Sequence, residues 1–248
     1  MITQTLNDGV LTLCLDRPGK KNALTAAMYR ALTDGLQAAS SDDNVRVVIL
    51  CAEGPDFCAG NDILDFAHGL PELKAAENLE DLPVFAFLKA LTFFAKPLVC
   101  AVQGQAVGVG VTVLLHCDLV VVADDARLTL PFLKLGLVPE AGSTLLLPRR
   151  IGHARAFAWM ALGEAIDAQK ALDMGLINRI TTPEALRATA QQMALQLTRL
   201  SPEALRHTKA LMRNPDEVWP VVCAEGDIFR ALLSSPQAQA AFMAFLNR

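Results

Sequence analysis

The sequence has no uninterrupted apolar run that approaches the roughly 18–20 residues of a membrane-spanning helix. Its first residues, MITQTLNDG, lack both the basic region and the apolar core of a secretory signal. Positive charge is also scarce, since 22 scattered Lys and Arg residues stand against 26 Asp and Glu, for a net charge of −4. This balance argues against nucleic acid as the main partner. We therefore expect a cytoplasmic protein that binds neither a membrane nor nucleic acid.

Several signatures of known chemistry are missing too. The six cysteines form no Cys-x-x-Cys pair and mostly lie in apolar runs, so we expect them to be reduced and buried. The four histidines lie far apart and match no metal-ligand spacing, so we expect no bound metal. The chain also lacks the Gly-Lys-Ser/Thr of a P-loop and the Gly-x-Ser-x-Gly of a nucleophile elbow. These absences exclude a P-loop nucleotide site and a serine nucleophile of the elbow type.

Apolar residues, by contrast, are abundant. They make up 52% of the 248 residues, and the mean hydropathy is +0.33. A chain of this size and composition can bury a large core and still expose apolar surface for contacts between subunits. Its length fits one large domain, or one domain with an extension.

The N-terminal part of the chain shows clear strand and helix patterns. Residues Ile2–Leu15 form two apolar runs around Asn7-Asp8-Gly9, which is typical of the tight turn in a β-hairpin. Thr25 predicts the N-cap of a helix that runs to about Ala39. Val45–Cys51 is apolar throughout, which indicates a strand buried on both faces.

The later segments differ in how clearly they can be read. Residues 65–82 are polar and mixed with no clear period, so we expect a mobile segment over a pocket. Thr182-Pro183-Glu184 and Ser201-Pro202-Glu203 each combine a cap, a proline and an acid, which predicts two helix starts. No linker or low-complexity segment divides the chain. We therefore expect a core over residues 1–181 and a helical extension of the same fold over residues 182–248.

The most informative stretch runs from Lys96 to Asp118. It contains an apolar run, a loop with Gly108 and Gly110, and a second apolar run, as expected where a buried strand leads into a buried helix. Glycines at such a junction let a ligand approach the backbone, and the first N–H groups of a helix lack partners within it. The loop is therefore a candidate site for a developing negative charge. Glycines required only for packing between helix and sheet explain the pattern equally well.

Three segments together resemble the enoyl-CoA hydratase/isomerase (crotonase) family. They are the basic loop Arg17–Leu24 (RPGKKNAL), the small-residue junction Phe57–Ile63 (FCAGNDI) and the stretch Pro97–Asp118, with glycines at 104, 108 and 110. Together they make the resemblance extend over most of the chain. It implies an α/β fold, namely a crotonase-like spiral of ββα units with a C-terminal helical extension. It also implies assembly as a homotrimer or a dimer of trimers.

The resemblance further implies an acyl-CoA thioester as the substrate. Coenzyme A then enters as part of the substrate, and no separate cofactor is expected. By motif, the backbone N–H groups of Asn61 and Val109 form the oxyanion hole that binds the thioester oxygen. One such donor, aimed at an oxygen on which charge develops, can contribute about 3–4 kcal/mol.

Departures from the family pattern indicate the reaction. Hydratases of the family carry glutamates at the positions of Thr112 and Phe132, and neither of these residues can act as a carboxylate base. A carboxylate occurs instead at Glu140, in a run that resembles the Δ3,Δ2-enoyl-CoA isomerases. In those enzymes one glutamate takes a proton from C2 of a 3-enoyl thioester and returns it at C4. We therefore predict an isomerase with Glu140 as its catalytic base. The alternative is that Glu140 is a solvated acid at the start of a helix.

The polyanionic CoA needs cations. Lys20, Lys21 and Arg248 are candidates for this role, although ordinary surface charge explains them equally well. The other substrate-binding candidates by motif are Ala23, Ala59, Asp62 and Ile63. For Asp62, a role at the start of a helix is an alternative. Hydration, another acyl-CoA reaction and non-catalytic acyl-CoA binding remain alternatives to isomerisation, because the fold alone does not fix the function.

Overall fold

The computed structural model describes residues 1–246. Its strands are β1 (Ile2–Asn7), β2 (Val10–Leu15), β3 (Val47–Ala52), β4 (Leu98–Val102), β5 (Gln105–Val107), β6 (Leu119–Ala123), β7 (Arg127–Thr129), β8 (Ile166–Asp167) and β9 (Arg179–Thr181). Its helices are α1 (Ala26–Ser41), α2 (Ile63–Ala75), α3 (Pro83–Phe93), α4 (Val109–Thr112), α5 (Ser143–Ile151), α6 (His153–Leu162), α7 (Ala168–Asp173), α8 (Pro183–Thr198), α9 (Pro202–Met212), α10 (Pro215–Leu232) and α11 (Pro236–Leu246). Short 3₁₀ helices cover Pro18–Lys20, Leu79–Asp81, Val113–His116 and Leu133–Leu135.

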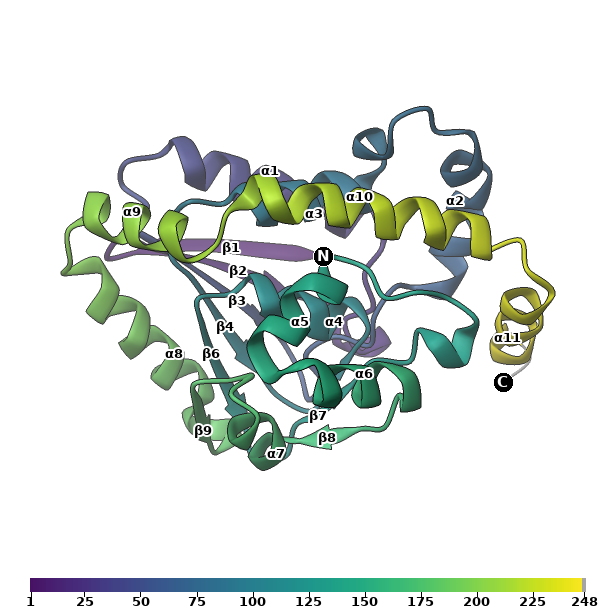
Figure 1. Cartoon of the computed structure of the whole chain (residues 1–248). Coiled ribbons are helices and arrows are strands. Elements are labelled where there is room, and N and C mark those ends of the chain that lie inside the picture. The colour runs from purple at the N-terminus through teal and green to yellow at the C-terminus, as the bar shows by residue number, and fades with distance from the viewer. Residues whose placement is uncertain (247–248) are drawn as a thin grey trace.

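A sheet of six strands, in the order β1-β2-β3-β4-β6-β9, lies at the centre of the fold (Figure 1). β1 and β2 pair antiparallel, with Ile2 opposite Leu15, which confirms the predicted hairpin. The other neighbouring strands of this sheet run parallel. β5, β7 and β8 form a second, smaller sheet. Parallel neighbours need crossover connections, and these connections carry the helices and loops that build the site.

The central strands are apolar on both faces because both faces are covered. In β3, Val48 and Leu50 belong to the main core, together with residues of α1 and α3. Val47 and Ile49 point to the opposite face and pack with residues of α8. Figure 1 shows α8 along one side of the sheet, while α10 crosses in front of α1 and α3. This burial on two sides confirms the interpretation of the continuous apolar run at Val45–Cys51.

The predicted helix starts are present. Thr25 caps α1, because its hydroxyl oxygen accepts a hydrogen bond from the Met28 N–H. Ser201 caps α9 in the same way, by accepting from the Ala204 N–H. Thr182 precedes α8 but its side chain makes no capping hydrogen bond within the described residues. From α8 onward the described chain is helical, as predicted.

The segment 65–82 corrects an expectation, because most of it is helical. α2 covers residues 63–75, and its N-cap is Asp62, whose side chain accepts from two backbone N–H groups of the first turn. Buried Leu73 and the partly buried Phe66 and Leu70 pack on the core at helical spacing. Pro71 lies inside this helix and hides the pattern, since proline normally ends or kinks a helix.

Two further features concern the chain as a whole. Among residues 1–246, no helix combines the length and the apolar character needed to span a bilayer. The cysteines are free thiols, as predicted, and all are buried except the partly exposed Cys223.

Candidate active site

The two small-residue junctions of the sequence lie side by side in the structure. Leu24 and Asn61 form one isolated β-bridge, and Cys58 and Ala106 form another. The second bridge includes a hydrogen bond of 2.9 Å from the Val107 N–H to the Cys58 oxygen. The loop that carries Asn61 is thus held between the early basic loop and β5, directly before α4.

The glycines at the start of α4 allow the backbone of the Cys58 loop to approach this helix closely. A Cβ at Gly110 would lie 2.8 Å from the Cys58 oxygen, which is too close for any side chain. Gly108 has a φ of 55°, in the left-handed region that glycine adopts most readily. Close approach of two segments of the chain therefore accounts for Gly110. β5 lies between β4 and the helix, so the strand does not lead directly into the helix as the pattern suggested.

Some backbone N–H groups at this junction are unused. Those of Asn61 and Val109 donate to no group among residues 1–246. The residue after Asn61 and the residue before Val109 are paired, since the Asp62 N–H donates to the Leu24 oxygen at 2.8 Å and the Gly108 N–H donates to β7. Val109 begins α4, so its N–H has no acceptor within the helix. Neither group is therefore taken up by an acceptor within the described residues.

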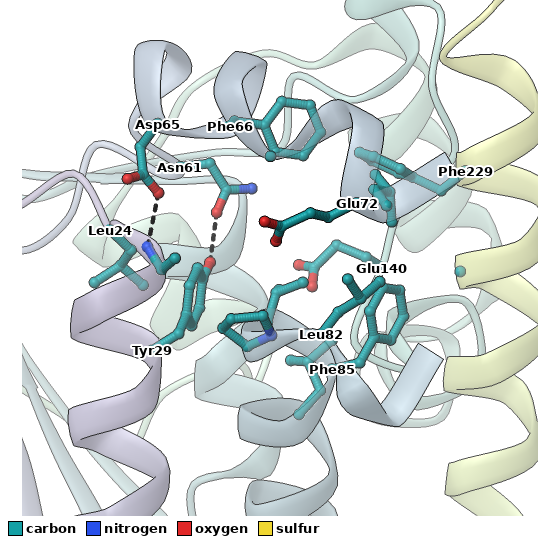
Figure 2. Close-up of a pocket in the computed structure, with 17 residues that line it drawn as sticks. Leu24, Tyr29, Asn61, Asp65, Phe66, Glu72, Leu82, Phe85, Glu140 and Phe229 are labelled. Atoms are coloured by element: carbon teal, nitrogen blue, oxygen red, sulfur yellow. Dashed lines mark hydrogen bonds between the residues drawn. The ribbon is translucent and has the colours of Figure 1, made fainter. Parts of the chain in front are cut away.

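A cavity of about 120 Å³ opens beside Asn61 and Glu140 (Figure 2). Its wall is mostly apolar and comes largely from α1, α2, α3 and α10. The lining residues are Leu24, Ala26, Tyr29, Asn61, Asp65, Phe66, Gly69, Glu72, Leu73, Leu82, Pro83, Val84, Phe85, Leu88, Glu140, Gly226 and Phe229. Val109 is absent from this wall and lies in the adjoining core, beside Phe87. Of the three predicted reaction residues, the structure therefore brings Asn61 and Glu140 to one cavity.

The carboxyl group of Glu140 has two different oxygen environments. Oε1 accepts a hydrogen bond of 2.5 Å from the Thr112 hydroxyl. Oε2 is buried and has no hydrogen-bond partner in the described part of the chain. Burial raises the pKa of Glu140 to about 7, the Thr112 hydrogen bond opposes this rise, and the negative charge of Glu225 adds to it. Such a carboxyl group can take up and release a proton near neutral pH.

The start of α5 is capped by Glu225, and not by Glu140. Glu225 comes from α10, is buried, and accepts from the Gly142 N–H at 2.6 Å and the Thr144 N–H at 2.8 Å. Ala141 and Gly142 both have positive φ, 64° and 70°, so the chain turns sharply between Glu140 and the helix. The acid that accepts hydrogen bonds from the start of α5 is therefore Glu225, and the alternative interpretation of Glu140 had assigned that role to Glu140.

Tyr29, which the sequence analysis did not single out, also lines the cavity. Its hydroxyl donates to the Asn61 side-chain oxygen at 2.5 Å, so it fixes the residue that carries one of the free N–H groups. Burial raises the pKa of Tyr29, and the negative charge of Glu140 adds to the rise. The hydroxyl therefore stays protonated at neutral pH. The sequence signal was available, because this lone tyrosine lies beside Met28 on the buried face of α1.

The expectation that residues 65–82 cover a pocket is confirmed for α2. Asp65, Phe66 and Glu72 all line the cavity, although none of them was a predicted site residue. Asp65 also accepts a hydrogen bond of 2.7 Å from the Ala26 N–H, which ties α2 to the start of α1. The hidden helical pattern explains why these residues were missed.

The predicted CoA-binding lysines lie outside the cavity. Lys20 and Lys21 are exposed on the early basic loop, and the Lys21 ammonium group is 3.7 Å from the Asp56 carboxylate. The Lys21 oxygen accepts from the Ala59 N–H at 2.9 Å, so Ala59 lies directly beside this loop. The early basic loop and the loop of Ala59 thus run side by side, and both lead to the cavity wall, the first at Leu24 and the second at Asn61.

The remaining candidates have structural contacts. Asp62 caps α2 and forms an ion pair of 2.7 Å with Arg17. Partial burial raises the pKa of Asp62, but hydrogen bonds from the Asp65 N–H and from Arg17 outweigh it and hold the pKa below the usual value. Ala23 accepts from Arg17, and Ile63 begins α2. Arg248 lies outside the described residues.

Metal ligands are not gathered at this site. Within residues 1–246, the structure brings together no group of three or more His, Cys, Asp or Glu side chains that could hold a metal ion.

Comparison with known proteins agrees with this geometry. The pattern that defines the enoyl-CoA hydratase/isomerase family matches residues 5–248. The chain is 36% identical over 200 residues to the 1,2-epoxyphenylacetyl-CoA isomerase of Escherichia coli K12, covering 79% of this chain and 75% of that protein. It is 34% identical over 241 residues to the 2,3-dehydroadipyl-CoA hydratase of the same strain, covering 96% and 92%. The solved structure of Pseudomonas aeruginosa OdaA has a TM-score of 0.93 and 43% identity, covering 100% of this chain and 99% of that one.

The protein is an acyl-CoA-processing enzyme by family, and the chain belongs to the enoyl-CoA hydratase/isomerase family. The predicted crotonase-like α/β fold with a C-terminal helical region is confirmed. The relatives include both isomerases and hydratases.

Proposed function

We propose that this enzyme is an enoyl-CoA isomerase that converts 3-enoyl-CoA into 2-trans-enoyl-CoA. One observation carries the proposal. The buried Oε2 of Glu140 has no hydrogen-bond partner among the described residues, and it belongs to a cavity-lining carboxyl group whose pKa is raised to about 7. A base with this pKa suits proton abstraction and return at neutral pH.

In the proposed mechanism, Glu140 takes a proton from C2 of the 3-enoyl thioester through Oε2. The electron pair shifts to give a dienolate, whose oxygen accepts hydrogen bonds from the Asn61 and Val109 N–H groups. Glu140 then returns the proton at C4, which leaves the double bond between C2 and C3. The two unused N–H groups and the hydrogen bond from Tyr29 to Asn61 support this arrangement, because donors fixed in advance stabilise developing charge best.

In the same proposal, the CoA moiety lies outside the cavity, along the early basic loop and the adjacent loop of Ala59. Lys20, Lys21, Ala23 and Ala59 lie on the two loops that lead to Asn61, so the nucleotide end would lie near the two lysines. Exposed ammonium groups suit a polyanionic ligand.

Hydration of a 2-enoyl-CoA is the second candidate. One observation favours it, because Glu72 brings a carboxylate besides those of Glu140 and Asp65 to the cavity wall, and a hydratase uses carboxylates to orient and activate water. Against it, the family positions of the hydratase glutamates hold Thr112 and Phe132, and Thr112 is bonded to Glu140.

Product analysis tests the proposal. Purified enzyme is incubated separately with 3-hexenoyl-CoA and 2-hexenoyl-CoA, and the products are identified by mass spectrometry and chromatography. We expect 2-trans-hexenoyl-CoA from the first substrate and slow or absent formation of 3-hydroxyhexanoyl-CoA from the second. Hydration as fast as isomerisation would favour the second candidate, and no reaction with either thioester would favour a non-catalytic acyl-CoA-binding protein.

A further inference from the structure

Glu72 is a charged residue in an otherwise mostly apolar part of the cavity wall. It lies on α2, and Figure 2 shows its carboxylate directed into the same space as that of Glu140. Glu72 is exposed, and its side chain makes no hydrogen bond or ion pair with any side chain that the structure describes. Its carboxylate therefore has no cationic partner among the described side chains.

The position of Glu72 is fixed by the packing of its helix. Phe66, one turn and a half earlier on α2, makes an edge-to-face contact with Phe229 of α10, with ring centres 6.2 Å apart. Leu73, the residue after Glu72, is buried in the core. Because Phe66 and Leu73 both pack against the rest of the protein, α2 holds the Glu72 carboxylate at the cavity wall.

An acyl group whose thioester oxygen lies near Asn61 and whose C2–C4 segment lies near Glu140 passes the Glu72 carboxylate. Phe66 and Phe229 belong to the wall of the same cavity. The charged residues that line the described cavity are Glu140, Asp65 and Glu72, and all three are acidic. The Asp65 carboxylate accepts a hydrogen bond from the Ala26 N–H, whereas the Glu72 carboxylate has no partner among the described side chains and points into the cavity.

We propose that Glu72 makes this site select uncharged acyl groups and exclude acyl groups that end in a carboxylate. This inference rests on the proposed function only in that it needs an acyl-CoA in the cavity. Two like charges that share a small, partly enclosed space repel each other, and the repulsion is large enough to change an affinity by about ten-fold or more. An apolar or aromatic acyl end, by contrast, can pack against the rings of Phe66 and Phe229 in the cavity wall.

Binding of two saturated thioesters of equal length tests the proposal without any turnover. The full-length enzyme is titrated with hexanoyl-CoA and with adipoyl-CoA in a calorimeter, and the ratio of the two Kd values is compared among variants. The variant is Glu72→Gln, which keeps the size and removes the charge. The matched control is Glu77→Gln, because Glu77 is an exposed glutamate after the end of α2 that does not line the cavity.

We expect the wild type to prefer hexanoyl-CoA, and Glu72→Gln to reduce this preference about ten-fold by tightening adipoyl-CoA. Glu72→Lys is expected to tighten adipoyl-CoA further, and Glu77→Gln to leave the ratio unchanged. A ratio that is the same in wild type and Glu72→Gln, with both thioesters bound, overturns the inference and leaves the proposed function intact. Failure of both thioesters to bind overturns the proposed function together with the inference.

Discussion

Thr112 and Glu140 share a hydrogen bond of 2.5 Å that uses one oxygen of the Glu140 carboxylate, and the other oxygen has no partner among residues 1–246. Thr112 ends α4, the same short helix whose first N–H belongs to Val109. One turn of helix therefore both orients the proposed base and supplies a proposed oxyanion donor. At a position where hydratases of the family carry a glutamate, this enzyme has a hydroxyl that positions a carboxylate from another segment.

Removing the Thr112 hydroxyl is expected to raise the pKa of Glu140. The hydrogen bond favours the ionised carboxylate, so its loss in Thr112→Val makes the proton harder to remove. We expect the acidic limb of the pH–rate profile of isomerisation to move to higher pH, while Thr112→Ser keeps it in place. Profiles of kcat/KM from pH 5 to 9 check this. An unchanged limb in Thr112→Val would show that the hydroxyl does not control the base.

The wild-type enzyme should lose activity as the pH falls through about 7. Glu140 has to be ionised to take a proton, and its pKa is raised to about 7 by burial. Below this pKa the active fraction falls about ten-fold per pH unit. The measurement is kcat/KM against pH, with circular dichroism at each pH to show that the fold persists. Full activity at pH 5 would mean that another group is the base.

Some elements could be predicted from the sequence because their signals are local. Thr25 and Ser201 cap helices through their own side chains, and the Asp-Gly turn at residues 8–9 specifies the β1–β2 hairpin. α2 could not be predicted, because Pro71 breaks the local pattern and packing against the core outweighs it.

The site was predictable only where a residue belongs to a motif. Asn61 and Glu140 were found in this way, and they meet at one cavity. Tyr29 and Glu225 were missed because their roles depend on partners far along the chain: Tyr29 bonds a residue 32 positions away, and Glu225 bonds one 83 positions away. Contacts between residues so far apart in the sequence depend on how whole helices pack, and a local sequence pattern cannot predict them.

Glu225→Ala should destabilise the fold. Glu225 accepts hydrogen bonds from the Gly142 N–H, the Thr144 N–H and the Thr144 hydroxyl, so its loss leaves the buried Gly142 N–H and the two Thr144 donors at the start of α5 without this partner. We expect a loss of about 2–3 kcal/mol in the free energy of unfolding. Thermal melting and urea unfolding check this, with Glu217→Ala on the exposed face of α10 as the control. Equal melting temperatures for both variants would contradict the capping role.

The enzyme is expected to form a trimer or a dimer of trimers. Large apolar side chains remain exposed on the single chain, among them Leu211 and Met212 on α9, which are 89% and 83% exposed. Surface of this kind is normally covered in an assembly. Light scattering after gel filtration at micromolar concentration measures the mass. A monomer under these conditions would contradict the expectation.

Glu140→Gln separates the two roles that the sequence allows for this residue. Glutamine keeps the size and can still accept from Thr112, but it cannot act as a base. Loss of general-base catalysis is expected to lower kcat about 10²–10⁴-fold, on the order of 3–5 kcal/mol in the barrier. Affinity for the thioester should change little, since the proposed N–H donors are untouched. The decrease should therefore be found in kcat and hardly in KM.

The stability of the same variant gives an independent result. The pKa of Glu140 is higher in the folded protein, about 7, than the ordinary value of 4.5 for a glutamate, so the folded state binds more protons between these two pH values. Stability then decreases as the pH rises through this window, because a buried carboxylate is being ionised. Replacing it with a neutral amide removes that penalty, so we expect Glu140→Gln to be no less stable than wild type at pH 8, and more stable by up to about 1–3 kcal/mol. A helix-start acid predicts the opposite pair of results, namely a loss of up to about 1 kcal/mol with turnover nearly intact. Melting temperature and isomerase turnover, both measured at pH 8, decide between them.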